Sequence, residues 1–389
     1  MKSIESPTRS DRRLGYLSGA PRVTTRRASD AAGPRAHVLG VIDGFERRGW
    51  TVSRYIVGDR MPEVVARDGE SMLHRGRAWT LAADIARMGL RGRHTSGAWS
   101  ELRTHVDWVY ERFALFQSLG SRFVRHGIPW ILETNAMLTE EASRERSGVV
   151  LTGLSRRLEQ RAYQECTALI AISQALADRL VAEMGVPREK VAVIPNGVDV
   201  HRFDPARVNT PRSARAKTTV LFVGSLASWQ GLDVLLRASA LVPEVNVTIA
   251  GDGPDRAALV ALAGQLHITP RFLGRVSPDD IPALIASADV CYSGHSAFRS
   301  PLKLYEYMAM ARPVISSAVP DARAALVEGQ SGFLFEPGDV DDLVRALRQA
   351  VSARECLDVM GQRARRDTVA HHSWDARVAA ICAHVEALT

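Results

Sequence analysis

The chain has 389 residues, of which 46% are hydrophobic and 24% are charged. That length is too great for one ordinary core and suits two α/β domains. No apolar run approaches the roughly 18 residues that a membrane span needs, and residues 1–13 lack the apolar stretch of a signal peptide. The four cysteines are scattered without CxxC spacing, which argues against metal or redox use and favours a reducing, cytoplasmic location.

The net charge is +7, and nearly all basic residues are arginines, because only Lys2, Lys190, Lys217 and Lys303 are lysines. A basic surface helps attract anionic small molecules or an anionic membrane surface. The sequence has neither a nucleic-acid-binding motif nor a basic-aromatic array, so we expect no nucleic-acid partner. A membrane surface is a possible partner that the sequence does not require.

Predicted strands and helices alternate through the first half of the chain. The expected strands are Leu14–Ser18, Trp50–Val57, Val106–Tyr110, Trp130–Glu133, Ala168–Ile172 and Val191–Ile194. We expect helices at Pro34–Arg48, near Trp79–Leu90 and at Thr139–Glu165, with a loop at Arg91–Gly97.

A second alternating set follows a polar, proline-bearing segment, Asp204–Lys217, which has the composition of a linker. Its expected strands are Thr219–Val223, Asn246–Ala250, Arg271–Leu273, Val290–Tyr292, Pro313–Ser316 and Gly332–Phe335. The order β-α-β-α in both halves predicts parallel sheets covered by helices. A final helix is expected at His372–Leu388.

The segment SPLKLYEYMAMARPVISS, residues 300–317, carries the clearest chemical pattern. Ser300 can cap a helix and Pro301 suits its first position, so the amides near Leu302 would be free to bind an anion such as a diphosphate. Lys303 would lie near that anion, and Glu306 on the same face could accept two hydrogen bonds from a ribose diol. A solvated surface Lys–Glu pair is the alternative.

Several segments in order resemble the family 4 glycosyltransferases of the GT-B fold. In the second half these are LFVGSLASWQGLDVLLRASALV (221–242), TIAGDGPDRAALVALA (248–263), FLGRVSPDDIPALIASADVCY (272–292), the helix at 300–317 and SGFLFEPGDVDDL (331–343). In the first half they are VDWVYERF (106–113), GIPWILETNAMLTEEA (127–142), ALIAIS (168–173) and IPNGVDVHRF (194–203).

The resemblance implies two Rossmann-like domains facing across a cleft. The expected domains are residues 1–205 on the acceptor side, a linker at 206–217, and residues 218–371 holding the nucleotide sugar, with residues 372–389 crossing back onto the first domain. It also implies a retaining transfer from a nucleoside-diphosphate sugar, a UDP-sugar being favoured, with no further cofactor. Glu306 would bind the nucleotide ribose, and Gly33 would let a loop approach the donor phosphates.

Three positions depart from the family pattern. The arginine that usually follows the strand glycine, here Gly224, is Ser225, and the usual lysine before the second glycine is Gln230. Phe298 stands where the family has an acidic residue, which leaves the sugar open. A leaving diphosphate needs cationic stabilisation. We therefore expect Lys303, helped by Arg299, to take that role, with Ser225 and Gln230 as neutral hydrogen-bond donors.

The acceptor is assigned to the first domain. Glu133 and Asn135 lie where one predicted strand ends and a loop begins, and Arg112 follows another strand. Ligands of open α/β sheets gather at such carboxyl ends. His37 lies on the first helix. Structural roles are the alternative: Asn135 as a helix cap, Arg112 as an ion-pair partner and His37 as a packed histidine. The acidic residues Glu133, Glu140 and Glu141 would suit a cationic acceptor such as an aminocyclitol.

No metal site is expected. Asp339-Val340-Asp341 matches the DxD pattern of metal-dependent transferases, but it follows Pro337-Gly338 and opens a helix, so capping is the better interpretation. The leading function is hexosyl transfer to a small polyol or aminocyclitol of secondary metabolism, such as antibiotic biosynthesis. Alternatives are a cell-envelope or polysaccharide transferase, a phosphorylase or epimerase on the same scaffold, and a non-catalytic nucleotide-sugar binding protein.

Overall fold

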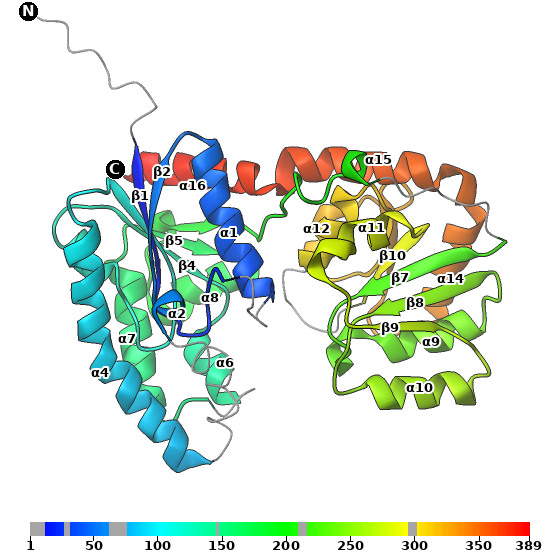
Figure 1. Cartoon of the computed structure of the whole chain (residues 1–389), viewed down its shortest axis with the longest axis horizontal. Helices are drawn as coiled ribbons and strands as arrows, with labels where there is room; N and C mark the ends of the chain where they lie inside the picture. The colour runs from blue at the N-terminus through cyan, green and yellow to red at the C-terminus, as the bar shows by residue number, and fades with distance from the viewer. Residues whose placement is uncertain (1–11, 27–31, 62–75, 145–147, 209–215, 295–301) are drawn as a thin grey trace, which may run out of the picture. The chain divides into compact units, whose positions relative to one another are not determined.

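The computed structural model describes residues 12–26, 32–61, 76–144, 148–208, 216–294 and 302–389. The chain divides into two compact units: the first contains residues 1–195 and 377–389, and the second contains residues 196–376. Each unit is built on one six-stranded sheet with helices packed around it (Figure 1). The structure confirms the predicted α/β fold with two Rossmann-like domains.

The sheet of the first unit is parallel and has the strand order β2-β1-β3-β4-β5-β6. Its strands are β1 (Arg13–Ser18), β2 (Thr51–Ile56), β3 (Trp108–Arg112), β4 (Trp130–Thr134), β5 (Ala168–Ala171) and β6 (Val191–Val193). The chain places β2 on one side of β1 and β3 on the other, so the strand order reverses between β1 and β3. Ligands of open α/β sheets bind at the carboxyl ends of strands beside such a point.

The helices of the first unit are α1 (Ala32–Arg47), α2 (Val57–Arg60), α4 (Arg77–Leu102), α5 (Ser121–Val124), α6 (Leu138–Arg144), α7 (Thr152–Glu165), α8 (Gln174–Met184) and the 3-10 turn η2 (Arg188–Lys190). The last helix, α16 (Trp374–Leu388), begins in the second unit and belongs to the first from Arg377 onward. No helix in the described part of the chain combines the length and the hydrophobicity that a membrane span requires.

The sheet of the second unit is also parallel, with the order β12-β11-β10-β7-β8-β9. Its strands are β7 (Thr218–Val223), β8 (Val245–Ala250), β9 (Arg271–Gly274), β10 (Val290–Ser293), β11 (Val314–Ser317) and β12 (Gly332–Phe335). Here the order reverses between β7 and β10, as in dinucleotide-binding folds. The loops that follow β7 and β10 are therefore the expected place for a ligand.

Helices cover both faces of this second sheet. They are α9 (Leu232–Ala240), α10 (Arg256–Gln265), α11 (Ile281–Ala286), α12 (Leu302–Ala309), α13 (Pro320–Ala325), α14 (Val340–Ser352) and α15 (Leu357–Asp367), with short turns η3 (Pro205–Arg207), η4 (Ser228–Gln230), η5 (Pro278–Asp280), η6 (Arg354–Cys356) and the π-helical η7 (Thr368–His372). Val220 and Phe222 lie in one hydrophobic cluster and Leu221 in another. Successive residues of β7 thus bury their side chains on opposite faces.

Asp339 is the N-cap of α14, and its carboxylate accepts a hydrogen bond of 2.9 Å from the backbone N–H of Asp342. This is the capping role that the sequence predicted for the DxD-like segment.

The division between the units differs from the predicted boundary. Val198, Val200 and Phe203 are buried in the core of the second unit together with α12. Val198 also pairs with Ser373 through a parallel bridge. Residues 196–208 therefore pack with the second unit, whereas the prediction placed the boundary after residue 205. Of the predicted linker, residues 209–215 lie outside the described residues.

Two local predictions in the first unit are wrong. Residues 91–97 form part of α4 and are not a loop. Gly97 lies within this helix, and a Cβ built there would stand 2.5 Å from the Tyr55 hydroxyl, so the glycine makes room for packing. The helix expected at 139–165 is two helices, α6 and α7. Asp84 accepts hydrogen bonds from Val150 N (2.8 Å) and Leu151 N (3.0 Å), which fixes the chain just before α7.

Candidate active site

The reversal of strand order in the second unit brings Gly224, directly after β7, close to the first turn of α12. Leu302 is the first residue of that helix as the structure describes it. The predicted cap Ser300, the predicted first helical residue Pro301, the auxiliary cation Arg299 and the unusual Phe298 lie outside the described residues. The site is therefore described from Gly224, Gln230, Lys303 and Glu306.

Lys303 is held beside the loops after β7. Its Nζ donates a hydrogen bond of 2.5 Å to Gln230 Oε1 and lies 4.2 Å from the centre of the Phe222 ring. Gln230 is itself buried. Burial against these groups lowers the pKa of Lys303 to about 7, and the nearby carboxylate of Glu306 acts in the opposite direction. Lys303 and Gln230, which the sequence assigned to one site, are thus in direct contact.

Gly224 has a positive φ of 153°, and a Cβ at this position would stand 2.9 Å from Lys303 Nζ. Gly251, directly after β8, has a φ of 133°. A Cβ built on Gly251 would be 1.8 Å from the carbonyl oxygen of Gly224. The bare backbones of the two glycines therefore let the ends of β7 and β8 approach each other beside Lys303.

Replacing Gly251 with alanine is expected to destabilise the second unit by more than about 2 kcal/mol, because the methyl group must displace the Gly224 backbone and adopt a disfavoured φ. Thermal unfolding measures the effect. Gly264→Ala is the matched control: this exposed glycine in α10 has no atom within 4 Å of its built Cβ, so alanine there should be neutral or slightly stabilising. Equal melting temperatures for the two variants would contradict the close approach.

Glu306 lies one turn beyond Lys303 on α12. Its side chain is partly exposed and makes no hydrogen bond or ion pair with any other residue that the structure describes. Burial raises the pKa of Glu306, while the charges of Arg202 and Lys303 lower it. An accessible carboxylate without a partner in this part of the chain is available to accept hydrogen bonds from a ligand.

Two further predicted donor residues lie at the surface. Ser225 follows Gly224 and is exposed. Gly33 is exposed within the first turn of α1, and nothing lies within 4 Å of a Cβ built on it. The sequence placed Gly33 in the loop before that helix, and the structure corrects this, because α1 already begins at Ala32. Contact of either residue with a donor stays a prediction.

In the first unit, the four residues predicted for the acceptor meet at the carboxyl ends of β3 and β4, beside the point where the strand order reverses. His37 Nε2 on α1 lies 2.7 Å from Glu133 Oε1, and both side chains are at most 4% exposed. The Tyr110 hydroxyl donates a hydrogen bond to Glu133 Oε2. Burial lowers the pKa of His37, so the imidazole is neutral and its Nε2–H donates a hydrogen bond to Glu133 Oε1.

Asn135 links this cluster to Arg112. With its amide oriented to satisfy both neighbours, Asn135 donates to Glu133 Oε1 at 2.9 Å and accepts from Arg112 Nη2 at 2.6 Å. Burial alone would raise the pKa of Glu133, but the interactions with His37, Arg112 and Tyr110 outweigh it, so the pKa lies below its ordinary value. Glu133 is thus an ionised carboxylate already satisfied by donors of the protein.

Protein groups already occupy most of the acidic side chains that suggested a cationic acceptor. Glu133 is occupied, and Glu140 pairs with Arg144 at 2.5 Å and with Arg179 at 2.6 Å. Two of the three acidic residues that suggested an amine subsite are therefore neutralised within the first unit. The groups left over beside Glu133 are hydrogen-bond donors: the Tyr16 hydroxyl and Arg112 Nη1 are buried without a partner among the described residues.

Tyr16, Tyr110 and Phe222 also belong to these sites and are not among the residues predicted from the sequence. Tyr16 and Tyr110 pair across β1 and β3, and their rings stack with centroids 5.7 Å apart. A tyrosine near the carboxyl end of each strand was a usable signal, because its hydroxyl reaches the edge where ligands bind. Phe222 had no such signal, since a phenylalanine in a buried strand is ordinary core.

Comparison with known families supports the same division of the chain. Residues 32–202 match the model of the family described as "Glycosyltransferase Family 4", and residues 208–367 match that of "Glycosyl transferases group 1". Each match covers most of one unit.

Two curated relatives match about half of the chain. A sulfoquinovosyl transferase of Arabidopsis thaliana is 28% identical over 50% of this chain and 40% of its own length. A D-inositol 3-phosphate glycosyltransferase of Mycobacterium sp. (strain JLS) is 31% identical over 50% of this chain and 47% of its own length. The chain thus spans about half the length of these relatives, whose names record different acceptors or sugars.

Solved structures resemble the fold over nearly the whole chain. Sucrose-phosphate synthase of Thermosynechococcus elongatus has a TM-score of 0.69 at 18% identity, covering 97% of this chain and 99% of that one. Anabaena HepE in complex with UDP has a TM-score of 0.64 at 16% identity, covering 96% and 100%. With both units matched by family models and the fold shared throughout, the chain belongs to the family 4 glycosyltransferases of the GT-B fold.

Proposed function

We propose that the protein is a retaining glycosyltransferase that moves a hexose-type sugar from a nucleoside-diphosphate sugar to the hydroxyl group of a small polyol. The observation that carries the proposal is the pair on α12: a positioned Lys303 amine and, one turn on, a Glu306 carboxylate without a partner in the described chain. The first group suits a diphosphate and the second a ribose diol.

Donor binding is assigned to the second unit. Lys303 and the bare backbone of Gly224 lie at the reversal of strand order, where nucleotides bind in related folds. HepE, a structural neighbour, has been crystallised with UDP and with UDP-glucose. That likeness favours a UDP-sugar as co-substrate.

Acceptor binding is assigned to the first unit, at the cluster of His37, Arg112, Glu133 and Asn135. The unpartnered Tyr16 hydroxyl and Arg112 Nη1 can donate hydrogen bonds to the oxygens of a polyol. Because Glu133 and Glu140 already have protein partners, we favour an uncharged polyol over an aminocyclitol. A role in secondary metabolism and a cytoplasmic setting, which the free thiols suit, belong to the same proposal.

The chemistry follows from these assignments. The bond between the anomeric carbon and the diphosphate oxygen breaks, and the acceptor oxygen forms a bond to the same face of that carbon. The acceptor proton passes to the departing diphosphate, so the protein needs no nucleophile of its own. Lys303 in its ammonium form stabilises the charge that develops on the leaving group, while Glu306 holds the nucleotide in position.

A donor screen tests this function. The full chain is heated with UDP-, GDP-, ADP- and dTDP-sugars, and a donor that binds the folded state raises the melting temperature by mass action. The best donor is then incubated with a panel of polyols, and the anomeric configuration of the product is read by nuclear magnetic resonance. Transfer with retention supports the proposal. A melting shift without transfer or hydrolysis would instead identify a nucleotide-sugar binding protein.

The low pKa of Lys303 gives a pH prediction. The amine must be protonated to stabilise the diphosphate, so kcat/KM should fall about tenfold per pH unit above about pH 7. In Lys303→Arg the guanidinium keeps its proton, and the remaining activity should lose this alkaline decline. A profile that is the same in wild type and Lys303→Arg would show that another group titrates.

A further inference from the structure

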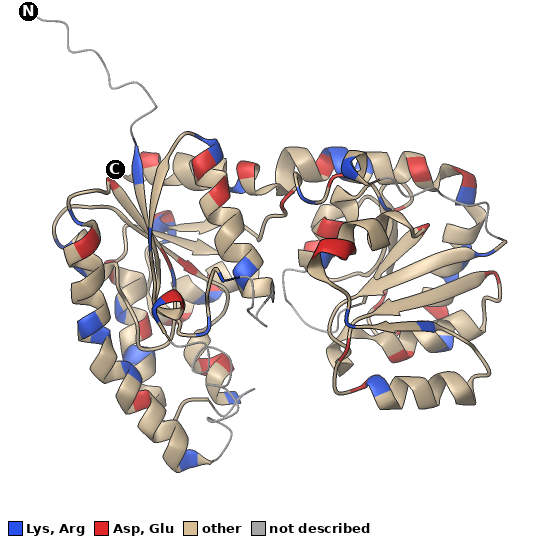
Figure 2. Cartoon of the chain, viewed as in Figure 1, with Lys and Arg blue, Asp and Glu red and all other residues tan. Residues whose placement is uncertain are grey.

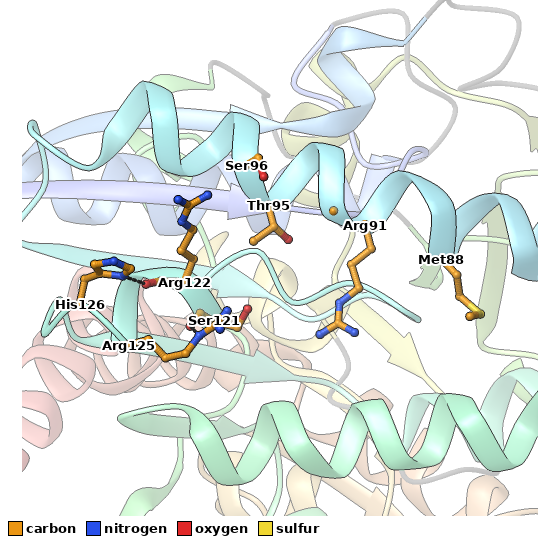
Figure 3. A pocket seen from close by; sticks show the side chains of 9 residues that line it. Met88, Arg91, Thr95, Ser96, Ser121, Arg122, Arg125 and His126 are labelled. Carbon is orange, nitrogen blue, oxygen red and sulfur yellow. Dashed lines mark hydrogen bonds between the residues drawn. The ribbon is translucent and has the colours of Figure 1, made fainter.

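A second site of the first unit lies between α4 and the segment that begins with α5. It is an open pocket of about 470 Å³ that shares no residue with the Glu133 cluster. Figure 3 shows Arg91 and Thr95 on α4 and Ser121, Arg122 and Arg125 on the facing segment. We call it the arginine pocket; its lining residues are Met88, Arg91, Gly92, Thr95, Ser96, Ser121, Arg122, Arg125 and His126.

The lining is basic and carries no carboxylate. Three arginines and a histidine are joined by the hydroxyl groups of Thr95, Ser96 and Ser121. Elsewhere along the chain of both units, basic and acidic residues are interspersed (Figure 2). An arrangement of guanidinium and hydroxyl donors around a hollow suits a phosphate group, which offers several strong acceptor oxygens.

The arginines are held in place by the fold. Arg91 donates to Ser118 Oγ at 2.7 Å, and Arg125 Nε donates to the carbonyl oxygen of Ser121 at 2.9 Å. The Arg122 guanidinium lies 5.3 Å from the centre of the Trp99 ring. None of these contacts neutralises a charge, and each leaves other N–H groups of its guanidinium for a ligand.

The nearest acidic groups do not cancel this charge. Glu165 pairs with Arg161 at 2.5 Å. Glu111, behind Arg91, is buried and accepts hydrogen bonds from Leu119 N at 2.9 Å and Gly120 N at 2.8 Å. Burial raises the pKa of Glu111 to about 7, so it is only partly ionised at neutral pH. Burial lowers the pKa of Arg91, and the charge of Arg161 lowers it further, while the charges of Glu165 and Glu111 act in the opposite direction.

We propose that the arginine pocket binds a phosphate group, carried either by a phosphorylated small molecule or by a phospholipid headgroup. Several arginines and no carboxylate face one hollow, and each arginine is oriented by a contact that leaves donors unused. A bound phosphate would relieve their mutual repulsion through charge-assisted hydrogen bonds. The proposal does not depend on the glycosyltransferase activity.

Two kinds of variant test the pocket. Arg122→Gln/Arg125→Gln removes charge, and its control is Arg103→Gln/Arg157→Gln, which removes the same charge from exposed positions of the same unit. Gly92→Leu fills the pocket without changing charge, because nothing lies within 4 Å of a Cβ built at Gly92. Its control is Gly264→Leu, at an equally open helical glycine of the second unit.

The first probe is inorganic phosphate, compared with sodium chloride at equal ionic strength, with the dissociation constant taken from melting temperatures. We expect phosphate to stabilise the wild type and both controls, and to bind both pocket variants at least about tenfold more weakly. Because phosphate could also bind near Lys303, the Lys303→Ala variant is included and should keep the response. A response lost in Lys303→Ala and kept in the pocket variants would overturn the proposal.

The second probe separates the two sources of phosphate. Sedimentation with phosphatidylcholine vesicles is compared with and without phosphatidic acid. Binding that needs phosphatidic acid and is lost in the pocket variants identifies a lipid headgroup, whereas a response to inorganic phosphate alone identifies a small molecule. If the pocket variants match their controls with both probes, the arginines are a solvated surface and the pocket has no phosphate ligand.

Discussion

Replacing Lys303 with alanine is expected to lower kcat about 100- to 1000-fold, the range found when one preorganised group that stabilises a developing charge is removed. The loss should be large because the chain has Ser225 and Gln230 where other members of the family have cations. KM for the acceptor should change little, since Lys303 belongs to the second unit. Initial rates at saturating donor measure both constants.

Two variants serve as controls for this loss. Lys217→Ala removes an exposed lysine of the same unit and should keep wild-type turnover. Gln230→Ala removes the hydrogen bond to Lys303 Nζ while leaving the charge, so it should lose much less than Lys303→Ala. Near-normal turnover in Lys303→Ala would mean that a cation other than Lys303 replaces the arginine and lysine that the family usually has at the positions of Ser225 and Gln230.

Replacing Glu133 with alanine is expected to destabilise the first unit by about 3–5 kcal/mol, because it leaves the buried His37 N–H and Tyr110 hydroxyl without their acceptor, and each unsatisfied buried donor costs about 1–3 kcal/mol. For a unit of this size, that corresponds to a fall of roughly 10 °C in melting temperature. Thermal unfolding followed by circular dichroism measures it.

The matched control is Glu165→Ala, which breaks the i,i+4 pair with Arg161. Such a surface pair contributes at most about 0.5 kcal/mol, so the melting temperature should hardly change. If the melting temperature of Glu133→Ala is no lower than that of Glu165→Ala, the buried cluster does not stabilise the unit. Glu133 would then be available to bind an acceptor.

The strands could be predicted from the sequence because each is a short buried run between helical segments. β12, for example, lies at the predicted residues 332–335. The prediction of a loop at 91–97 is wrong. Gly97 is needed because the Tyr55 hydroxyl packs against its backbone, and Tyr55 is distant in the sequence. Glycine alone does not distinguish a turn from a close contact.

In the candidate site, too, some features could be predicted from the sequence and others could not. Lys303 and Glu306 could be singled out because helix spacing places them on one face. The contact between Lys303 and Gln230, 73 residues apart, could not be predicted, since it depends on the order of strands in the sheet. The role of Glu133 changed for a similar reason: its partners His37 and Tyr110 come from α1 and β3, and only the fold shows that they satisfy the carboxylate.

The central claim is that α12 binds a nucleoside diphosphate, with Lys303 on the phosphates and Glu306 on the ribose. Calorimetric titration of the full chain with UDP and with uridine tests it most directly. Glu306→Ala should weaken both ligands about 10- to 100-fold, as expected for the loss of charged hydrogen bonds, whereas Lys303→Ala should weaken UDP and leave uridine unchanged. Equal affinities of wild type and both variants for UDP would contradict the claim.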